Sequence, residues 1–216
     1  MTDRVVIWGA SGHALVVADI LRLAGREVVG FIDDMDAERR GQRFAGARVL
    51  GGRESLESLH ADGVRAIVVA VGNCAARLRL ADVVRQHGLE LARAVHPRAV
   101  VAEGVTLGAG TVVCAGAIVN PGSSIGESAI VNTAATIDHE CVIADGAHVG
   151  PGAHLGGRVR VGRGAWIGIG ATVSDRVVIG AESVVGAGAV VLNDVPRKVV
   201  AFGVPARVVR DVDEGD

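Results

Sequence analysis

The chain has 216 residues, which is enough for one large domain or two small ones. A formal net charge of −2 without a basic stripe argues against electrostatic binding of nucleic acid, and no apolar run approaches the ~18 residues that cross a membrane. Hydrophobic residues make up 50% of the chain but aromatic residues only 2%. We therefore expect a core of thin, regular layers, as in repeat proteins.

The three cysteines are Cys74, Cys114 and Cys141, and they show neither disulfide nor metal-ligand spacing. The first residues lack the apolar region of a signal peptide. These features predict a reduced, cytoplasmic protein with no metal and no membrane insertion.

Residues 1–94 alternate short apolar strands with helical segments. Strands are expected at 4–8, 28–32 and 66–71, and helices at about 14–24 and 75–87. In the first helix the expected apolar face consists of Leu15, Ala18, Leu21 and Leu23. This strand–helix–strand order predicts a small, Rossmann-like α/β domain with a parallel sheet.

The pattern changes at Val95, and from there to Val191 an aliphatic residue recurs at every sixth position. Four residues after each of these stands Ala, Ser, Thr, Cys or Val. Period six predicts a parallel β-helix, in which three hexapeptides close a triangular coil of 18 residues and coils stack ~4.8 Å apart. A β-sandwich would instead show period two. We expect the β-helix over residues 95–196 and a C-terminal tail over 197–216.

The most informative polar residues lie inside these repeats. In the six-residue frame Ile137 and Cys141 point into the narrow lumen, so His139 falls near a corner and faces outward. An outward histidine is more often a solvated surface residue than a catalytic one, and the spacing alone leaves both interpretations open. Cys141 occupies an inward small-residue position, so we expect it to fill the core and not to act as a nucleophile.

Three segments together resemble the family of sialic-acid O-acetyltransferases and nucleotide-linked amino-sugar N-acetyltransferases. They are Gly9-Ala10-Ser11-Gly12-His13, Asp138-His139-Glu140 and Gly203-Val204-Pro205-Ala206. The resemblance covers nearly the whole chain and implies a left-handed β-helix, a hand that the period itself does not specify. It also implies a homotrimer, acetyl-CoA as co-substrate, and a 4-amino-4,6-dideoxy sugar linked to a nucleotide as acceptor.

The resemblance further implies roles for individual residues. His139 is the general base, Glu140 raises its basicity and His148 contacts acetyl-CoA. Backbone groups that face the thioester or the cofactor belong to Gly157, Ile169 and Ala187, although the family often has Gly at the position of Ala187. The residues that hold the nucleotide sugar are Ser11, Gly12, His13, Asp33, Asp34, Gly72 and Asn73.

Coil spacing gives an independent expectation about this site. Gly157 follows His139 by 18 residues, so the two stack in adjacent coils, where the Gly157 N–H would stabilise a developing oxyanion. Trp166 stacks on His148 and Ala187 on Ile169 in the same way. His148 lies half a coil away from His139, so we expect the active site to form between neighbouring subunits.

The expected chemistry is direct acetyl transfer. The sugar amine attacks the thioester carbonyl and loses a proton, which an imidazole accepts near neutral pH. The thiolate of CoA is a good leaving group, so no acyl-enzyme is required.

The N-terminal glycine turn differs from the dinucleotide fingerprint, because Ala14 stands where a third glycine would be sought. An NAD site is therefore not expected, although a helix N-terminus after such a turn suits a phosphate. Asp33 and Asp34 end a strand, where they would bind base or ribose or simply cap a turn. Both interpretations remain open.

Three alternatives stand beside this hypothesis. The first is O-acetylation of sialic acid or another sugar. The second is a metal enzyme resembling γ-class carbonic anhydrases, with zinc on His139, His148 and His154, but such enzymes lack the α/β domain and the Asp-His-Glu segment. The third is a non-catalytic sugar-binding or scaffolding protein, which would need neither His139 nor Glu140. The sequence does not distinguish UDP, GDP and dTDP.

Overall fold

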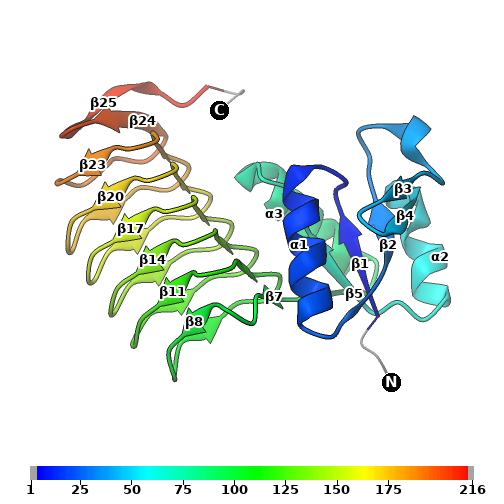
Figure 1. Ribbon diagram of the computed structural model, residues 1–216. Coiled ribbons are helices and arrows are strands. Elements are labelled where there is room, and N and C mark those ends of the chain that lie inside the picture. Colours follow the sequence, from blue (N-terminus) through cyan, green and yellow to red (C-terminus); the bar gives the residue numbers. More distant parts are fainter. Residues whose placement is uncertain (1–3, 214–216) are drawn as a thin grey trace.

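The computed structural model describes residues 4–213, which form an α/β part and a β-helix lying side by side (Figure 1). The α/β part contains one six-stranded sheet in the order β3-β4-β2-β1-β5-β6, parallel except for the β3–β4 hairpin. Its strands are β1 Arg4–Trp8, β2 Glu27–Ile32, β3 Arg43–Phe44, β4 Ala47–Gly51, β5 Ala66–Val69 and β6 Glu90–Leu91. Its helices are α1 Gly12–Leu23, α2 Leu56–Ala61 and α3 Cys74–Gln86, with single 3₁₀ turns at Ala37–Arg39 and Arg53–Ser55.

These elements confirm the predicted strand–helix–strand order, and the segment from β3 to α2 was not predicted. The expected apolar face of α1 was partly wrong, because Leu15 is 49% and Leu23 56% exposed. The helix instead buries Ala14, Val17 and Leu21 together with Ala18. This set follows the i, i+3, i+4, i+7 spacing of one helical face, and Leu15 and Leu23 lie outside it.

The β-helix confirms the 18-residue coil. Each strand pairs in parallel with the strand 18 residues later, as Thr136 does with His154 and His148 with Trp166. The two-residue strands are β7 Ala94–Val95, β8 Val100–Val101, β9 Thr106–Leu107, β10 Val112–Val113, β11 Ile118–Val119, β12 Ser124–Ile125, β13 Ile130–Val131, β14 Thr136–Ile137, β15 Val142–Ile143, β16 His148–Val149, β17 His154–Leu155, β18 Arg160–Val161, β19 Trp166–Ile167, β20 Thr172–Val173, β21 Val178–Ile179, β22 Val184–Val185 and β23 Val190–Val191.

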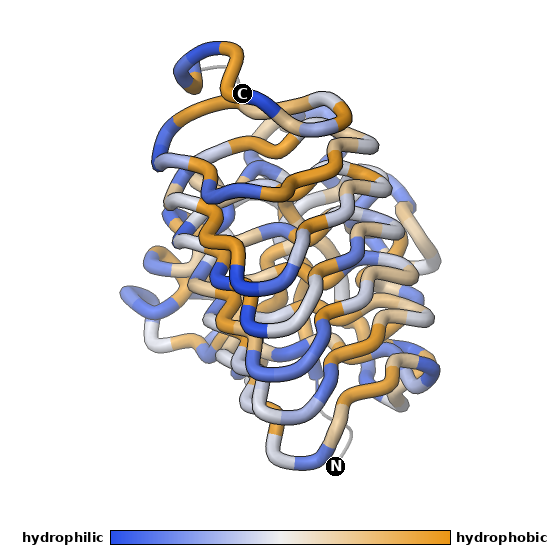
Figure 2. The backbone as a smooth tube through the Cα atoms, turned by 90° about the vertical axis from the view of Figure 1, so that its left-hand side faces the viewer, coloured by the Kyte–Doolittle hydropathy of each residue, from blue (hydrophilic) through white to orange (hydrophobic). Residues whose placement is uncertain are grey.

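The strands form the three sides of a triangular prism. Side one contains β7, β10, β13, β16, β19 and β22, side two runs from β8 to β23, and side three from β9 to β21. The predicted aliphatic and small residues are buried in one continuous cluster along the lumen. Figure 2 shows hydrophobic segments recurring along successive coils. Because each coil rests on the next, the stack fixes which side chains lie above one another.

The corners of the prism impose a strict backbone requirement. Every sixth residue from Gly104 to Gly188 has a positive φ, a conformation that suits glycine because it lacks a Cβ. Most of these corner positions hold glycine, and the others hold Ser128, Ala134, Glu140 (φ 59°), Arg158 (φ 62°), Arg176 (φ 61°) and Glu182.

The last coil is covered by a C-terminal hairpin. Strand β24 (Val199–Gly203) pairs in parallel with β22 and antiparallel with β25 (Ala206–Asp211). The edge that the last coil presents on side one is thereby paired.

Side one also carries the α/β part, as Figure 1 shows for α1, α3 and β7. Residues of α1 share a buried cluster with Val112, Cys114 and Ile130 of the prism. Arg77 of α3 is fully buried and donates hydrogen bonds to the carbonyls of Ser128 (2.7 Å) and Gly146 (2.8 Å). Apolar packing and a buried guanidinium therefore join the two parts.

Candidate active site

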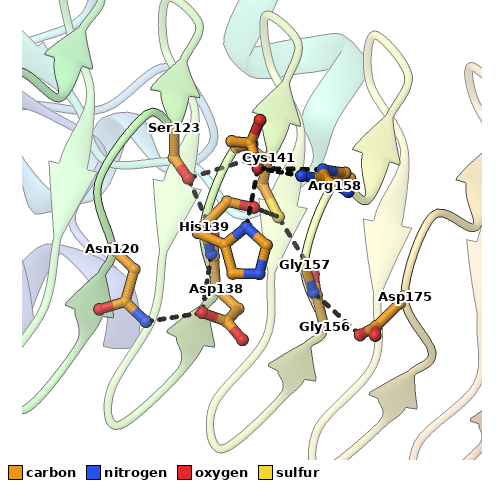
Figure 3. Close-up of polar contacts among 10 residues, drawn as sticks. Asn120, Ser123, Asp138, His139, Cys141, Gly156, Gly157, Arg158 and Asp175 are labelled. Atoms are coloured by element: carbon orange, nitrogen blue, oxygen red, sulfur yellow. Dashed lines mark hydrogen bonds and ion pairs between the residues drawn. The ribbon is translucent and has the colours of Figure 1, made fainter.

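His139 lies at the corner between β14 and β15, and its side chain is 51% exposed. Its Nδ1 lies 3.0 Å from Glu140 Oε2 (Figure 3). The backbone N–H of His139 donates to Asp138 Oδ1, which also accepts from the Asn120 amide at 3.0 Å. The corner is thus braced from the coil below, and the imidazole projects to the outside.

Glu140 is held between two partners. Its Oε2 accepts from Nε of Arg158 at 2.9 Å as well as contacting His139. These hydrogen bonds, that of Arg158 first, hold the pKa of the Glu140 carboxyl below its usual range. Glu140 therefore stays ionised and accepts a hydrogen bond from a proton on His139 Nδ1, which favours the tautomer with the lone pair of Nε2 free.

Gly157 stacks beside His139 as the 18-residue spacing predicted. A Cβ at Gly157 would lie only 2.6 Å from His139 Nε2, so the ring takes this position because residue 157 is glycine. The Gly157 N–H donates to Asp175 Oδ1 at 3.0 Å. The donor that we expected to face a thioester oxygen is therefore paired with a carboxylate in the free protein.

Cys141 lies in the lumen, as its position in the repeat predicted. It is fully buried, and its Sγ contacts the Gly156 carbonyl oxygen at 3.2 Å. Burial raises the pKa of the thiol, which disfavours the nucleophilic thiolate. Ser123 braces this corner by donating to the Asp138 carbonyl and accepting from the Cys141 N–H.

His148 lies on side one, away from the His139 corner. It is 5% exposed, its Nε2 lies 3.0 Å from the Asn132 amide nitrogen, and its ring packs 4.3 Å from that of Trp166. The ring of His13, from the α/β part, lies 6.5 Å away. Burial, followed by nearby Arg77, lowers the pKa of His148 to about 3 and that of His13 to about 4. Both imidazoles are therefore neutral.

The cofactor residues implied by the resemblance lie at another corner. Ile169 and Ala187 are exposed and stack at the corner between sides one and two, whereas His139 and Gly157 share the corner between sides two and three. The structure therefore brings together His139, Glu140 and Gly157, and within one chain it does not bring His148, Ile169 or Ala187 to them.

The proposed nucleotide-sugar residues follow three adjacent strands. Ser11, Gly12 and His13 follow β1, Asp33 and Asp34 follow β2, and Gly72 and Asn73 follow β5. The carboxyl ends of parallel strands form one edge of the sheet, and β1 lies at the point where the chain reverses direction across it, which is the usual ligand-binding place in such sheets.

The two aspartates at this edge also have structural contacts. Asp33 accepts from the backbone N–H groups of Ala10 and Met35, both at 2.8 Å. Asp34 accepts from the backbone and side chain of Arg53. Asp33 and Asp34 therefore do stabilise the local turns, as one of the two interpretations predicted. A cavity of about 170 Å³ lies beside them and is lined also by Asp36, Arg40 and Glu54.

Four residues that brace the His139 corner were missed in the sequence: Asn120, Ser123, Arg158 and Asp175; Asp138 was named only as part of the Asp138-His139-Glu140 segment. Asp138 lies 18 residues after Asn120, Arg158 lies 18 after Glu140, and Asp175 lies 18 after Gly157. The spacing that paired His139 with Gly157 would have found them. Within residues 4–213, no group of three or more metal-ligating side chains is present and no helix is long and apolar enough to span a membrane.

Comparisons with known proteins agree with the fold. Residues 4–84 match the PglD N-terminal domain model, and residues 158–193 match the bacterial transferase hexapeptide model of six repeats. A search of curated protein sequences found no match. With these two matches, the fold and the site define a hexapeptide-repeat acyltransferase with a left-handed β-helix.

Solved structures are similar over nearly the whole chain. GDP-perosamine N-acetyltransferase from Caulobacter crescentus, in complex with CoA and GDP-perosamine, is 42% identical at a TM-score of 0.92, over 96% of this chain and 97% of that chain. The acetyltransferase domain of PglB from Neisseria gonorrhoeae, in complex with acetyl coenzyme A, is 35% identical at a TM-score of 0.90, over 97% and 100%. WeeI from Acinetobacter baumannii AYE is 27% identical at 0.86, over 95% and 99%. The chain belongs to the family of hexapeptide-repeat acetyltransferases that contains the Caulobacter enzyme.

Proposed function

We propose that this protein transfers the acetyl group of acetyl-CoA to the 4-amino group of a nucleotide-linked 4-amino-4,6-dideoxy sugar. The supporting observation is the exposed imidazole of His139, with Nδ1 on Glu140 and Nε2 against Gly157, in a chain similar over nearly its whole length to an enzyme solved with CoA and GDP-perosamine. Two structures of that enzyme are variants in which one histidine is replaced by alanine or by asparagine.

His139 acts as the general base in this proposal. Acetyl-CoA supplies an acetyl group on a thiol that departs readily. Nε2 of His139 accepts the proton that the sugar amine loses as the new C–N bond forms, and later returns it to the departing sulfur. Glu140 keeps the other ring nitrogen protonated and stabilises the imidazolium that forms. The buried Cys141 takes no part.

The complete site requires a second copy of the chain. The His139 corner lies opposite side one, which carries the α/β part and His148. We infer a homotrimer in which the His139 corner of one subunit faces side one of its neighbour, together with the corner of Ile169 and Ala187. This arrangement brings base, acetyl-CoA contacts and nucleotide sugar to one place between subunits.

In this proposal the α/β part and the β-helix have different roles. Residues 1–94 hold the nucleotide sugar through Ser11, Gly12, His13, Asp33, Asp34, Gly72 and Asn73, and residues 95–196 carry acetyl transfer, with 197–216 as a C-terminal tail. Gly12 and Gly72 border open space, since a Cβ at either would meet no atom within 4 Å. Such an edge admits close approach by a ligand. The reaction uses a cytoplasmic supply of acetyl-CoA.

The test measures release of CoA thiol from acetyl-CoA with UDP- and GDP-linked 4-amino sugars as acceptors. His139→Ala is expected to lower kcat at least 100-fold and to leave the assembly unchanged in sedimentation. His154→Ala is the matched control, because His154 is an exposed histidine on side two, hydrogen-bonded to Thr136. Full activity of His139→Ala would remove the proposed base, and turnover with hydroxyl but not amino acceptors would establish O-acetylation instead.

A further inference from the structure

Two side chains approach the Gly156-Gly157 peptide from opposite coils. His139 lies on one side, with Nε2 against Gly157, and Asp175 lies on the other, with Oδ1 accepting the Gly157 N–H at 3.0 Å (Figure 3). A Cβ at Gly156 would collide with the same Asp175 oxygen. Neither position has room for a side chain, so both must be glycine, and the N–H of Gly157 beside the imidazole is paired with the Asp175 carboxylate.

This N–H needs an acceptor at all times. Gly157 is buried, and a buried N–H without an acceptor is unfavourable. Under the proposed function, the oxygen of the thioester arrives beside His139 Nε2, where the same N–H is the adjacent backbone donor. Asp175 and that oxygen compete for one hydrogen, and the charged carboxylate is the stronger acceptor.

We propose that Asp175 is a specificity-determining residue of the acetyl-transfer site, whose carboxylate caps the Gly157 N–H in the free protein and is exchanged for the thioester oxygen when acetyl-CoA binds. This inference rests on the proposed function. Because the thioester oxygen must displace the Asp175 carboxylate, the affinity for acetyl-CoA is lower than it would be with no carboxylate on the Gly157 N–H. CoA has no acetyl oxygen and leaves the Asp175 cap in place, so its affinity is not lowered. Asp175 therefore reduces the ratio of the affinity for acetyl-CoA to the affinity for the product CoA.

The chain contains a matched copy of this cap without the histidine. Asp145 Oδ1 accepts the Glu127 N–H at 2.8 Å, also across 18 residues and also after a glycine, Gly126. That cap lies at the corner between sides one and three. The fold therefore uses such caps to satisfy its corners, and what distinguishes Asp175 is the imidazole on the other face of the capped peptide.

The experiment titrates the full-length protein with acetyl-CoA and with CoA in a calorimeter and compares the two dissociation constants. Asp175→Ala is expected to raise the affinity for acetyl-CoA relative to CoA roughly fivefold to tenfold. Asp175→Asn keeps a neutral acceptor and is expected to give a smaller increase. Asp145→Ala is expected to leave the ratio unchanged.

An unchanged or reduced ratio in Asp175→Ala would overturn the inference, as would the same change in Asp145→Ala. If Asp175→Ala does not fold, the ratio in Asp175→Asn decides. Wild-type protein that binds both ligands, with no change in either Asp175 variant, would refute only the exchange. Wild-type protein that binds neither ligand would refute the proposed function and this inference with it.

Discussion

At the corner that carries His139, side chains are positioned by adjacent residues and by residues one coil away. Asn120 holds Asp138, Asp138 holds the His139 backbone, and Arg158 holds Glu140. The imidazole thereby stands on a short corner that is braced by the neighbouring coils, which reduces the reorganisation needed for proton transfer. The close approach of the Gly157 backbone makes this arrangement sensitive to one added carbon.

Gly157→Ala is therefore expected to lower kcat about 100-fold, because its Cβ would displace the imidazole by an ångström or more. Thiol release measures kcat, and the melting temperature is expected to change little, since the ring can rotate into solvent. The double variant Gly157→Ala with His139→Ala is the control. It should be no slower than His139→Ala alone, because both changes act on the same imidazole. Additive losses would show that Gly157 acts independently of the ring.

The coil is the repeating element, and its corners store strain wherever a residue other than glycine occupies the left-handed position. This conformation costs an L-residue about 1–2 kcal/mol. At Glu140 and Arg158 the strain accompanies an ion pair at the site. Arg176 is exposed and has the same strained conformation, but within residues 4–213 the structure shows no ion pair of its side chain.

Arg176→Gly is expected to stabilise the protein by about 0.5–1 kcal/mol, because relief of the corner strain exceeds the extra entropy that glycine gives the unfolded chain. A small rise in melting temperature would show this. Arg160→Gly is the comparison, since Arg160 is exposed in strand β18, where glycine weakens the structure. A lower melting temperature for Arg176→Gly would contradict the strain argument.

At the scale of the whole molecule, the two parts are joined through Arg77. Its guanidinium bonds the carbonyls of Val71 and Gly72 on its own side and of Ser128 and Gly146 on the prism. This fixes the edge that bears Gly72 against side one. The geometry of the proposed nucleotide-sugar site therefore depends on the β-helix as well as on the α/β part.

Arg77→Met is expected to destabilise the protein by about 3 kcal/mol or more, since it leaves several buried carbonyls without a donor. Thermal melting and limited proteolysis between the two parts would measure this loss. Arg79→Met is the control, because Arg79 is exposed on the same helix. Equal melting temperatures for the two variants would refute the role of Arg77 in joining the parts.

Acid is expected to weaken the same junction. Burial lowers the pKa of His148 to about 3 and that of His13 to about 4, below the ~6.5 of a free imidazole. Between about pH 6.5 and 4 the unfolded chain binds more protons than the folded chain. Stability therefore falls with decreasing pH in this window, by up to about 1.4 kcal/mol per unit for each histidine.

Melting temperatures at pH 7 and pH 5 would test this dependence. His148→Gln is expected to lose less on acidification than the wild type, and His154→Gln, which alters an exposed histidine, to lose as much as the wild type. Identical losses in all three proteins would contradict the assignment to the buried pair.

The sequence predicted the β-helix well because every hexapeptide repeats the same physical requirement, an aliphatic residue and a small one facing a narrow lumen. The same spacing predicted that His139 faces outward and stacks beside Gly157, whereas its role as general base was implied only by the family resemblance and stays a prediction. The sequence did not predict that Leu15 and Leu23 are exposed, since two helical faces of α1 are apolar and only tertiary packing selects one. Nor did it predict the paired state of the Gly157 N–H, which depends on the rotamer of Asp175.

The 18-residue ladder between strands also constrains how such a chain changes its length. Gain or loss of six residues between His139 and Gly157 would turn all later side chains by a third of a revolution and place an unrelated residue against the imidazole. Gain of a full turn would restore the angular register but interpose another coil between Glu140 and Arg158. The coils from Asn120 to Asp175 therefore form a segment of fixed length.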